Sequence, residues 1–182
     1  MPLPKQNMTA QDYWSLPDGV RAELIDGELW DLASPSRVHQ LICAQLTAAF
    51  IGHIAAHGGD CQVYAAPFAV NLFDDETTFV EPDVSVICDR VKLSGRGCEG
   101  APDLVVEVVL PSSRGMDYRT KHVLYSDAGV REYWIVDPST SRTTVYRFEA
   151  DPAPVQYPFE EPVPCGVLTG LTVDVAGIVA RM

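Results

Sequence analysis

The stretch PDLVVEVVL at residues 102–110 decides the fold, because it is an almost unbroken apolar run with a single glutamate inside it. Apolar, β-branched runs without polar alternation are typical of strands that are buried on both faces of a sheet. A carboxylate that is buried there without a partner is costly. The run therefore predicts a central strand over residues 104–110, in which Glu107 contacts a cation.

A second acid has a similar setting in the upstream stretch VEPDVSVI at residues 80–87. Pro82 has no N–H to donate, so the residues around Asp83 are expected at the start of a strand or on a sheet edge. Two strand carboxylates that lie close together can bind a divalent cation, since Mg²⁺ prefers oxygen ligands. We interpret Asp83 and Glu107 as metal ligands. The alternatives are a turn-forming Asp83 and a Glu107 that is paired with an arginine.

A lysine follows the second acid on a predicted helix. The segment from 112 or 113 to 128 is expected to begin at a serine cap and to end at Gly129. Lys121 lies on this segment, where its ammonium group could neutralise charge that develops on a phosphate. Asp117, four residues earlier, could orient that ammonium group, or the two residues could form an ordinary ion pair on the helix face.

The rest of the chain mixes strand and helix patterns around one mostly buried sheet, which favours an α/β or α+β fold. The Asp-Gly pair at residues 26–27 predicts a β-hairpin over residues 21–33. A long helix is expected from Ser36 to the two glycines at 58–59, because apolar residues recur between them at helical spacing. The other expected elements are short helices at 9–16 and after Asp174, strands at 61–72, 79–88, 130–136, 143–148 and 167–173, and irregular segments at 91–100 and 151–164.

Length and composition bound the class of protein. A chain of 182 residues is expected to form one domain, residues 1–182. No stretch reaches the roughly 18 apolar residues that a membrane span needs. Residues 1–6 lack an apolar signal core, so we expect a cytoplasmic protein. The five cysteines include no Cys-x-x-Cys pair, which predicts mostly free thiols, no disulfide framework and no zinc knuckle.

The charge of the chain constrains any function on nucleic acid. Its formal net charge is −12, whereas nucleic-acid-binding domains usually present a basic surface. A DNA substrate would therefore need locally gathered basic side chains and a bound metal ion that offsets the acids. The most basic part of the chain is its middle, with Arg90, Lys92, Arg96, Arg114, Arg119 and Lys121.

Longer patterns around these residues resemble a known family. The stretches GAPDLVVEVVLPSSR (100–114) and GVREYWIVDP (129–138) resemble the Uma-type endonucleases, long described as a domain of unknown function. The spacing Asp117-x-x-x-Lys121-x-x-x-Tyr125 between them fits the same family. The stretches ELIDGEL and SRVH, which begin at residues 23 and 36, are similar to it as well. The resemblance covers about residues 9–175.

This resemblance implies the fold of the PD-(D/E)xK nuclease superfamily, a restriction-endonuclease-like central mixed β-sheet flanked by helices. Pro82 and Asp83 followed by Glu107 resemble the superfamily signature, but Val109 stands where that signature has lysine. The resemblance implies that the lysine has moved to the following helix, which Lys121 fits.

The resemblance also implies residue roles and an activity. Glu23 would support the metal through water, and His39 would line the cleft. The alternatives are a solvent-facing Glu23 and a capping or surface His39. The implied activity is hydrolysis of DNA phosphodiester bonds by a homodimer with Mg²⁺ or Mn²⁺. The other function left open is a catalytically inactive nuclease-fold protein that acts as an interaction or regulatory module. The residues assigned to catalysis are Asp83, Glu107, Lys121, Glu23, His39 and Asp117.

Overall fold

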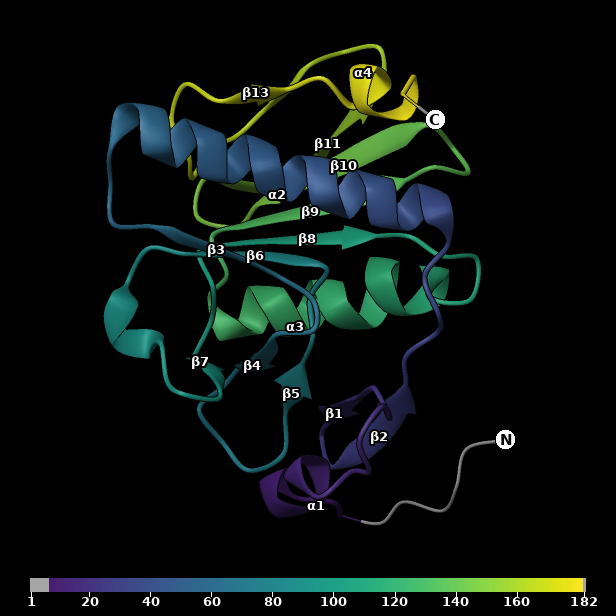
Figure 1. Ribbon diagram of the computed structural model, residues 1–182, viewed down its shortest axis with the longest axis vertical. Helices are drawn as coiled ribbons and strands as arrows, with labels where there is room; N and C mark the ends of the chain where they lie inside the picture. The colour runs from purple at the N-terminus through teal and green to yellow at the C-terminus, as the bar shows by residue number, and fades with distance from the viewer. Residues whose placement is uncertain (1–6, 182) are drawn as a thin grey trace.

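The computed structural model describes residues 7–181 and has a mixed α+β fold in which helices cover the sheets (Figure 1). Helix α2 (Arg37–His57) lies across one face of the largest sheet, and α3 (Lys121–Ala128) lies across the other. This sheet consists, in spatial order, of β11 (Asp151–Pro158), β10 (Arg142–Arg147), β9 (Glu132–Asp137), β8 (Leu104–Val108), β6 (Val84–Ile87) and β3 (Gln62–Ala65).

Strand β8 lies in the interior of this sheet, as the apolar run predicts. All five of its residues are buried, and it pairs parallel with β9 and antiparallel with β6. Val108 packs in the cluster that contains Phe50 of α2, whereas Val109 packs with Tyr125 of α3. Because side chains alternate along a strand, Glu107 shares the α3 face with Val109.

Helix α2 begins and ends where the sequence predicts. Ser36 caps it by accepting a hydrogen bond from the His39 N–H at 3.2 Å, and Gly58 follows its last turn. Ile42 and Leu46 bury its apolar side against the sheet. Among the described residues, α2 alone is long and apolar enough to cross a membrane by length and composition, a test that the core helix of a soluble protein also passes.

A second, five-stranded sheet lies on the far side of α3 from α2 (Figure 1). Its spatial order is β2 (Glu28–Asp31), β1 (Ala22–Ile25), β5 (Phe79–Val80), β4 (Ala69–Asn71) and β7 (Gly97–Glu99). The predicted hairpin is β1 and β2. Asp26 and Gly27 both have positive φ at its turn, as a two-residue type I′ hairpin requires. Helix α1 (Ala10–Trp14) packs on this sheet, with Tyr13 stacked on Phe79.

The predicted strands at 61–72 and 79–88 are each divided between the two sheets. The first contains β3 and β4, and the second contains β5 and β6. Pro67 and Pro82 lie at the two breaks, where the missing N–H of proline interrupts a ladder. The segment at 91–100, expected to be irregular, contains β7, and a short 3₁₀ turn, η1 (Arg90–Lys92), overlaps its start.

The expectation of an irregular segment at 151–164 is wrong over its first half, which is strand β11. This strand pairs antiparallel with β10 at the edge of the large sheet, where proline is tolerated because its missing N–H can face outward. The strand expected at 167–173 is shorter and is β13 (Thr172–Val173), paired with β12 (Val163–Pro164). Helix α4 (Val175–Val179) follows, capped by Asp174 as predicted.

Cys61 and Cys88 form a disulfide, whereas the sequence predicts mostly free thiols and no disulfide framework. Cys61 directly precedes Gln62 of β3 and Cys88 directly follows Ile87 of β6, and the pairing of Gln62 with Ile87 brings the two cysteines together. Their separation of 27 residues gives no sign of this contact, because strand register alone creates it. The remaining cysteines, Cys43, Cys98 and Cys165, are free and buried. The expectation concerning residues 1–6 lies outside the described part of the chain.

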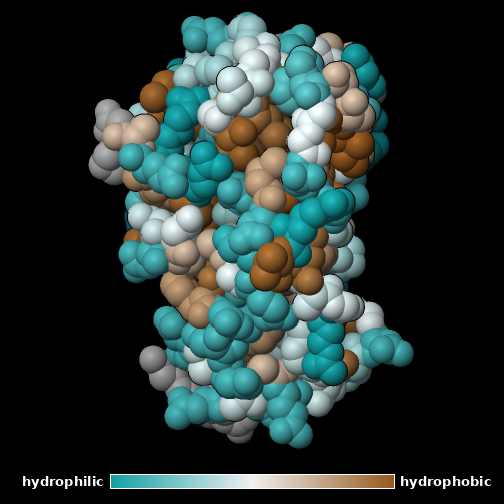
Figure 2. All heavy atoms as spheres, turned by 90° about the vertical axis from the view of Figure 1, so that its left-hand side faces the viewer, coloured by the Kyte–Doolittle hydropathy of each residue, from teal (hydrophilic) through white to brown (hydrophobic). Residues whose placement is uncertain are grey.

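Hydrophobic side chains on the surface are dispersed. On the face shown in Figure 2, they form separate patches among hydrophilic residues. Two tryptophans are partly exposed elsewhere in the fold, Trp14 at 40% and Trp30 at 43%. Exposed apolar residues that occur singly are normal in folded proteins and need no functional explanation.

Glu132, the first residue of β9, is a buried strand acid with a structural role. Its carboxylate accepts hydrogen bonds from Trp134 Nε1 at 2.8 Å and from the backbone N–H groups of Gly166 at 2.7 Å and Val167 at 2.8 Å. These bonds attach the turn after β12 to the large sheet. Glu132 therefore shows what a buried glutamate looks like when the fold itself satisfies it.

Glu132→Ala should destabilise the protein, because it leaves three donors without an acceptor in the interior. We expect the free energy of unfolding in urea to fall by about 3–5 kcal/mol, the range for a broken buried charge network. Glu149→Ala is the control, because its exposed ion pair with Arg131 should contribute about 0–1 kcal/mol. Equal effects of the two substitutions would contradict this role for Glu132.

Candidate active site

A pocket of about 540 Å³ lies where β8, the first turns of α2, and the hairpin of β1 and β2 meet. Its lining includes all six candidate residues: Glu23, His39, Asp83, Glu107, Asp117 and Lys121. Glu23 comes from β1, His39 from α2 and Glu107 from β8. Asp83 directly precedes β6, Asp117 lies in the segment before α3, and Lys121 is the first residue of α3. The fold thus gathers side chains that are far apart in the sequence into one cavity.

Glu107 and Lys121 form a buried ion pair in this pocket. The Lys121 Nζ atom lies 2.8 Å from Glu107 Oε1 and 2.9 Å from Glu23 Oε1, and each of the three side chains is at most 5% exposed. The Tyr125 hydroxyl donates to the same Glu107 oxygen at 2.6 Å. Glu23 also accepts a hydrogen bond from the Glu81 N–H at 3.0 Å. Glu23 is therefore not the solvent-facing acid of the alternative interpretation.

Asp83 lies at the start of the strand next to that of Glu107. Val84, the first residue of β6, pairs with Val106 of β8, and Asp83 directly precedes it. Asp83 Oδ2 also accepts a hydrogen bond from the Val108 N–H at 2.7 Å, which fixes the carboxylate at the strand end.

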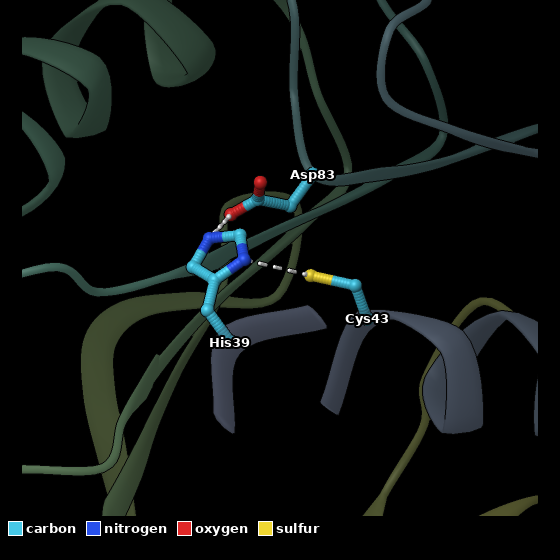
Figure 3. Close-up of side chains that lie close together, drawn as sticks. All are labelled: His39, Cys43 and Asp83. Atoms are coloured by element: carbon cyan, nitrogen blue, oxygen red, sulfur yellow. Dashed lines mark hydrogen bonds and ion pairs between the residues drawn. The ribbon is translucent and has the colours of Figure 1, made fainter. Parts of the chain in front are cut away.

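His39 reaches Asp83 from the first turn of α2 (Figure 3). Its Nε2 atom lies 3.1 Å from Asp83 Oδ2, and its Nδ1 atom lies 3.5 Å from Cys43 Sγ, one helical turn further along. The His39 side chain is 7% exposed, so it is not a surface histidine. Burial raises the pKa of the Cys43 thiol far above its usual value. The thiol therefore stays protonated, which argues against a nucleophilic cysteine.

Asp117 lies in a π-helical segment, η2 (Met116–Thr120), that runs directly into α3. The Ser113 hydroxyl donates to the Asp117 carboxylate at 2.6 Å, so this serine holds Asp117 instead of capping the helix backbone. Within residues 7–181, no ion pair joins Asp117 to Lys121, whose ammonium group contacts Glu23 and Glu107. We predicted that Asp117 orients the Lys121 ammonium group, or that the two residues form an ion pair on the helix face. Neither is accompanied by a direct contact between the two side chains.

The buried charges shift one another's pKa values. Burial raises the pKa of Glu107 well above its usual value, against the opposing effect of Lys121. Burial lowers the pKa of Lys121, but Glu107, Glu23 and Asp117 together raise it well above its ordinary value. Burial also raises the pKa of Asp117 to about 6. Lys121 is therefore a firmly protonated cation, surrounded by more carboxylates than it can neutralise.

Acids outnumber bases in the lining of the pocket. The lining contains one arginine and one lysine. Arg21 is paired with Glu81 at 2.8 Å, and Lys121 is paired with Glu23 and Glu107 as described above. The acids of the lining are Glu23, Asp31, Glu81, Asp83, Glu107 and Asp117. A phosphate entering this cavity would meet repulsion unless a bound cation offset the acids. The pocket is therefore suited to bind a cation, and to bind an anion only when that cation is present.

Comparison with known proteins identifies the family. Residues 10–176 match the family model Uma2, described as "Putative restriction endonuclease". The chain belongs to the Uma2 family. It is 28% identical over 140 residues to "Uncharacterized protein slr1290" of Synechocystis sp. (strain ATCC 27184 / PCC 6803 / Kazusa), which covers 77% of this chain and 72% of that protein.

A solved structure shares the fold of this Uma2 chain. It is the crystal structure of "a putative nuclease belonging to DUF820" from Anabaena variabilis ATCC 29413, with a TM-score of 0.77 and 18% identity. The match covers 95% of this chain and 98% of that one. The predicted family and the predicted restriction-endonuclease-like fold, with mixed β-sheet flanked by helices, are thereby confirmed.

Several residues in or beside the Uma2 pocket received no role from the sequence. Tyr125 stands one helical turn after Lys121, in a spacing quoted only for the resemblance, and this spacing could have indicated that both contact Glu107. Cys43 stands one turn after His39 on the predicted helix, which is a signal of the same kind. The pairing of Arg21 with Glu81 left no such signal, because 60 residues separate the two.

Asp117→Asn should change how stability depends on pH. Because the pKa of Asp117 rises from 3.8 to about 6 on folding, the folded chain binds more protons than the unfolded chain between these values. Below about pH 4 this carboxyl therefore does not change the free energy of unfolding. As the pH rises from 4 through 6, its ionisation lowers the stability of the fold increasingly. We expect the variant to be more stable than wild type by about 3 kcal/mol at pH 7 and equally stable at about pH 4.

Urea unfolding with a metal chelator present would measure this difference across the pH range. Asp127→Asn, an exposed acid on α3, is the control and should follow the wild-type profile. An Asp117→Asn curve parallel to wild type from pH 4 to 7 would show that the carboxyl is not strained by burial.

Proposed function

We propose that this Uma2 chain is a metal-dependent DNA phosphodiesterase that cleaves the sugar–phosphate backbone as an endonuclease. The observation that carries the proposal is the convergence of Asp83, Glu107 and Lys121 in one pocket, where Asp83 directly precedes β6 and Glu107 lies on the neighbouring β8. The family description and the nuclease-like fold support the same reading. The family description and the fold leave open the metal, the substrate and the activity itself. These three are what we propose.

The donors in the pocket fit a divalent cation such as Mg²⁺ or Mn²⁺. Asp83 and Glu107 each have one oxygen engaged in the contacts given above, Oδ2 and Oε1. Among the described residues, no hydrogen bond is made to Asp83 Oδ1 or Glu107 Oε2. Two carboxylate oxygens on adjacent strands form the hard, anionic set that Mg²⁺ and Mn²⁺ prefer. A cation held there would polarise a phosphate and lower the pKa of an attacking water.

The remaining side chains of the pocket have distinct tasks in this proposal. Lys121 keeps its proton and places a positive charge where a phosphate would approach the acids, so it stabilises the charge of the transition state. Glu23 also contacts the ammonium group, at 2.9 Å, which restricts its position. His39 holds Asp83 at 3.1 Å and closes the wall formed by α2.

Cleavage of both strands of a duplex needs two such pockets, so the proposal includes a homodimer. The contact surface proposed for it is the hairpin of β10 and β11, which forms one edge of the large sheet.

An interaction or regulatory module on the same fold is the second candidate function. The net charge of −12 and the excess of acids in the pocket favour it, because both weaken binding to DNA. The two functions differ in one measurable respect. Only the nuclease responds to Mg²⁺ or Mn²⁺ by cleaving plasmid or single-stranded DNA.

Glu107→Gln should abolish that cleavage and also the stabilisation by metal. Mg²⁺ or Mn²⁺ should raise the melting temperature of the wild type, since a ligand of the folded state stabilises it. The variant should lose this gain because it lacks one of the two anionic ligands. Glu132→Gln, another buried strand glutamate but one outside the pocket lining, is the matched control and should keep both responses. Wild-type protein that cleaves no DNA with either metal would leave the interaction module as the function.

Lys121→Met should lower the cleavage rate by about 100-fold or more, the usual cost of removing one preorganised donor from a transition state. Metal binding should remain, since the lysine is not a ligand. Adding Val109→Lys should restore part of the rate, because position 109 lies on the same face of the sheet as Glu107. Circular dichroism must show that both variants fold. Cleavage by Lys121→Met at the wild-type rate would remove the lysine from the mechanism.

A further inference from the structure

Cys43, His39 and Asp83 form a compact cluster of metal-ligating groups that the proposed nuclease chemistry does not fully use (Figure 3). One ligand atom from each residue, the thiol sulfur, a ring nitrogen and a carboxylate oxygen, lies within 4.8 Å of the other two. All three side chains line the pocket, so the cluster is accessible to ions that enter it.

The local structure explains why these three groups meet. Cys43 and His39 are four residues apart on α2, which places both side chains on one face of the helix. Asp83 comes from the strand end that α2 covers, and its carboxylate is held toward the ring by the Val108 N–H. Two of the three residues therefore lie on a regular helix, and the third directly precedes a strand.

A zinc site requires its ligand atoms to lie close together. Zinc–sulfur bonds of about 2.3 Å and zinc–nitrogen or zinc–oxygen bonds of about 2.0–2.2 Å put neighbouring ligands of a tetrahedron about 3.3–3.7 Å apart. The three ligand atoms here lie within 4.8 Å of one another. The His39 ring contacts Cys43 Sγ at 3.5 Å and Asp83 Oδ2 at 3.1 Å through different nitrogens, so the side chains must rotate before one ion can reach all three.

We propose that Cys43, His39 and Asp83 bind one thiophilic divalent ion of the Zn²⁺ class, with water in the fourth position. On binding, the Cys43 thiol loses its proton to solvent and the thiolate becomes a ligand, while His39 ligates as the neutral imidazole. A soft thiolate selects Zn²⁺ over Mg²⁺, whereas the carboxylate pair of Asp83 and Glu107 has the opposite preference.

Asp83 belongs to both ligand sets, so the two ions exclude each other. Zn²⁺ in the cluster withdraws Asp83 from the site proposed for Mg²⁺ and thereby inhibits cleavage. The zinc site itself does not depend on nuclease activity, whereas the inhibition rests on the proposed function.

Titration of the protein with Co²⁺, a spectroscopic substitute for Zn²⁺, tests the ligands directly. Wild-type protein should develop the intense near-ultraviolet absorption of a thiolate–Co²⁺ bond, and Zn²⁺ should displace it. Cys43→Ser should remove this band and weaken Zn²⁺ binding by about tenfold or more. Cys98→Ser, a buried free thiol outside the pocket lining, is the matched control and should keep both. A wild-type protein without the band at saturating Co²⁺ overturns the proposal without any variant.

Competition between the ions tests the shared ligand. Excess Mg²⁺ should weaken Zn²⁺ binding to the wild type, and Asp83→Asn should weaken it in the absence of Mg²⁺. Glu107→Gln should keep the Co²⁺ band, because Glu107 is not in the cluster, while losing its response to Mg²⁺. Zn²⁺ affinity that ignores both Mg²⁺ and Asp83→Asn overturns the mutual exclusion. Absence of DNA cleavage with an intact Co²⁺ band would refute the proposed nuclease and leave the zinc site standing.

Discussion

The buried contact of Lys121 with Glu107 and Glu23 is the constraint on which the rest of the pocket depends. Taking these three charges out of water is expensive, and a buried ion pair seldom stabilises a fold more than apolar side chains of similar size would. One lysine also cannot neutralise two glutamates. The fold nevertheless encloses them with β8, α3 and the hairpin of β1 and β2. The stability of the fold does not require these buried charges. A chemical role for them in the pocket is therefore the better explanation of their presence.

The sequence predicted those parts of the fold and site that depend on local chemistry. The apolar run around Glu107 could only be a buried strand, and Ser36 marked the start of α2 through its capping hydroxyl. The Cys61–Cys88 disulfide and the division of two predicted strands between sheets depend on register between distant segments, which spacing along the chain does not show. The partner predicted for Asp117 was wrong because the pattern assumed a regular helix, whereas η2 is π-helical.

The position of the lysine follows from packing. Val109 lies in the apolar cluster with Leu124 and Tyr125, so a hydrophobic side chain fills the strand position two residues after Glu107. Lys121 reaches the same face from the helix, and the Tyr125 hydroxyl, one turn later, donates to the same oxygen of Glu107. The helix thus supplies both the cation and the hydroxyl that contact Glu107.

The excess of acids explains how an acidic chain could act on an acidic polymer. A basic surface would attract DNA over its whole length, whereas a pocket with more carboxylates than cations rejects phosphate until a metal ion enters. In the proposed function, metal binding and substrate binding would then be coupled, because each neutralises charge that the other brings. Asp83 would stand at the centre of this coupling, since it lines the pocket with Glu107 and contacts His39 on α2. The ion that Asp83 binds would therefore determine whether the pocket accepts a phosphate.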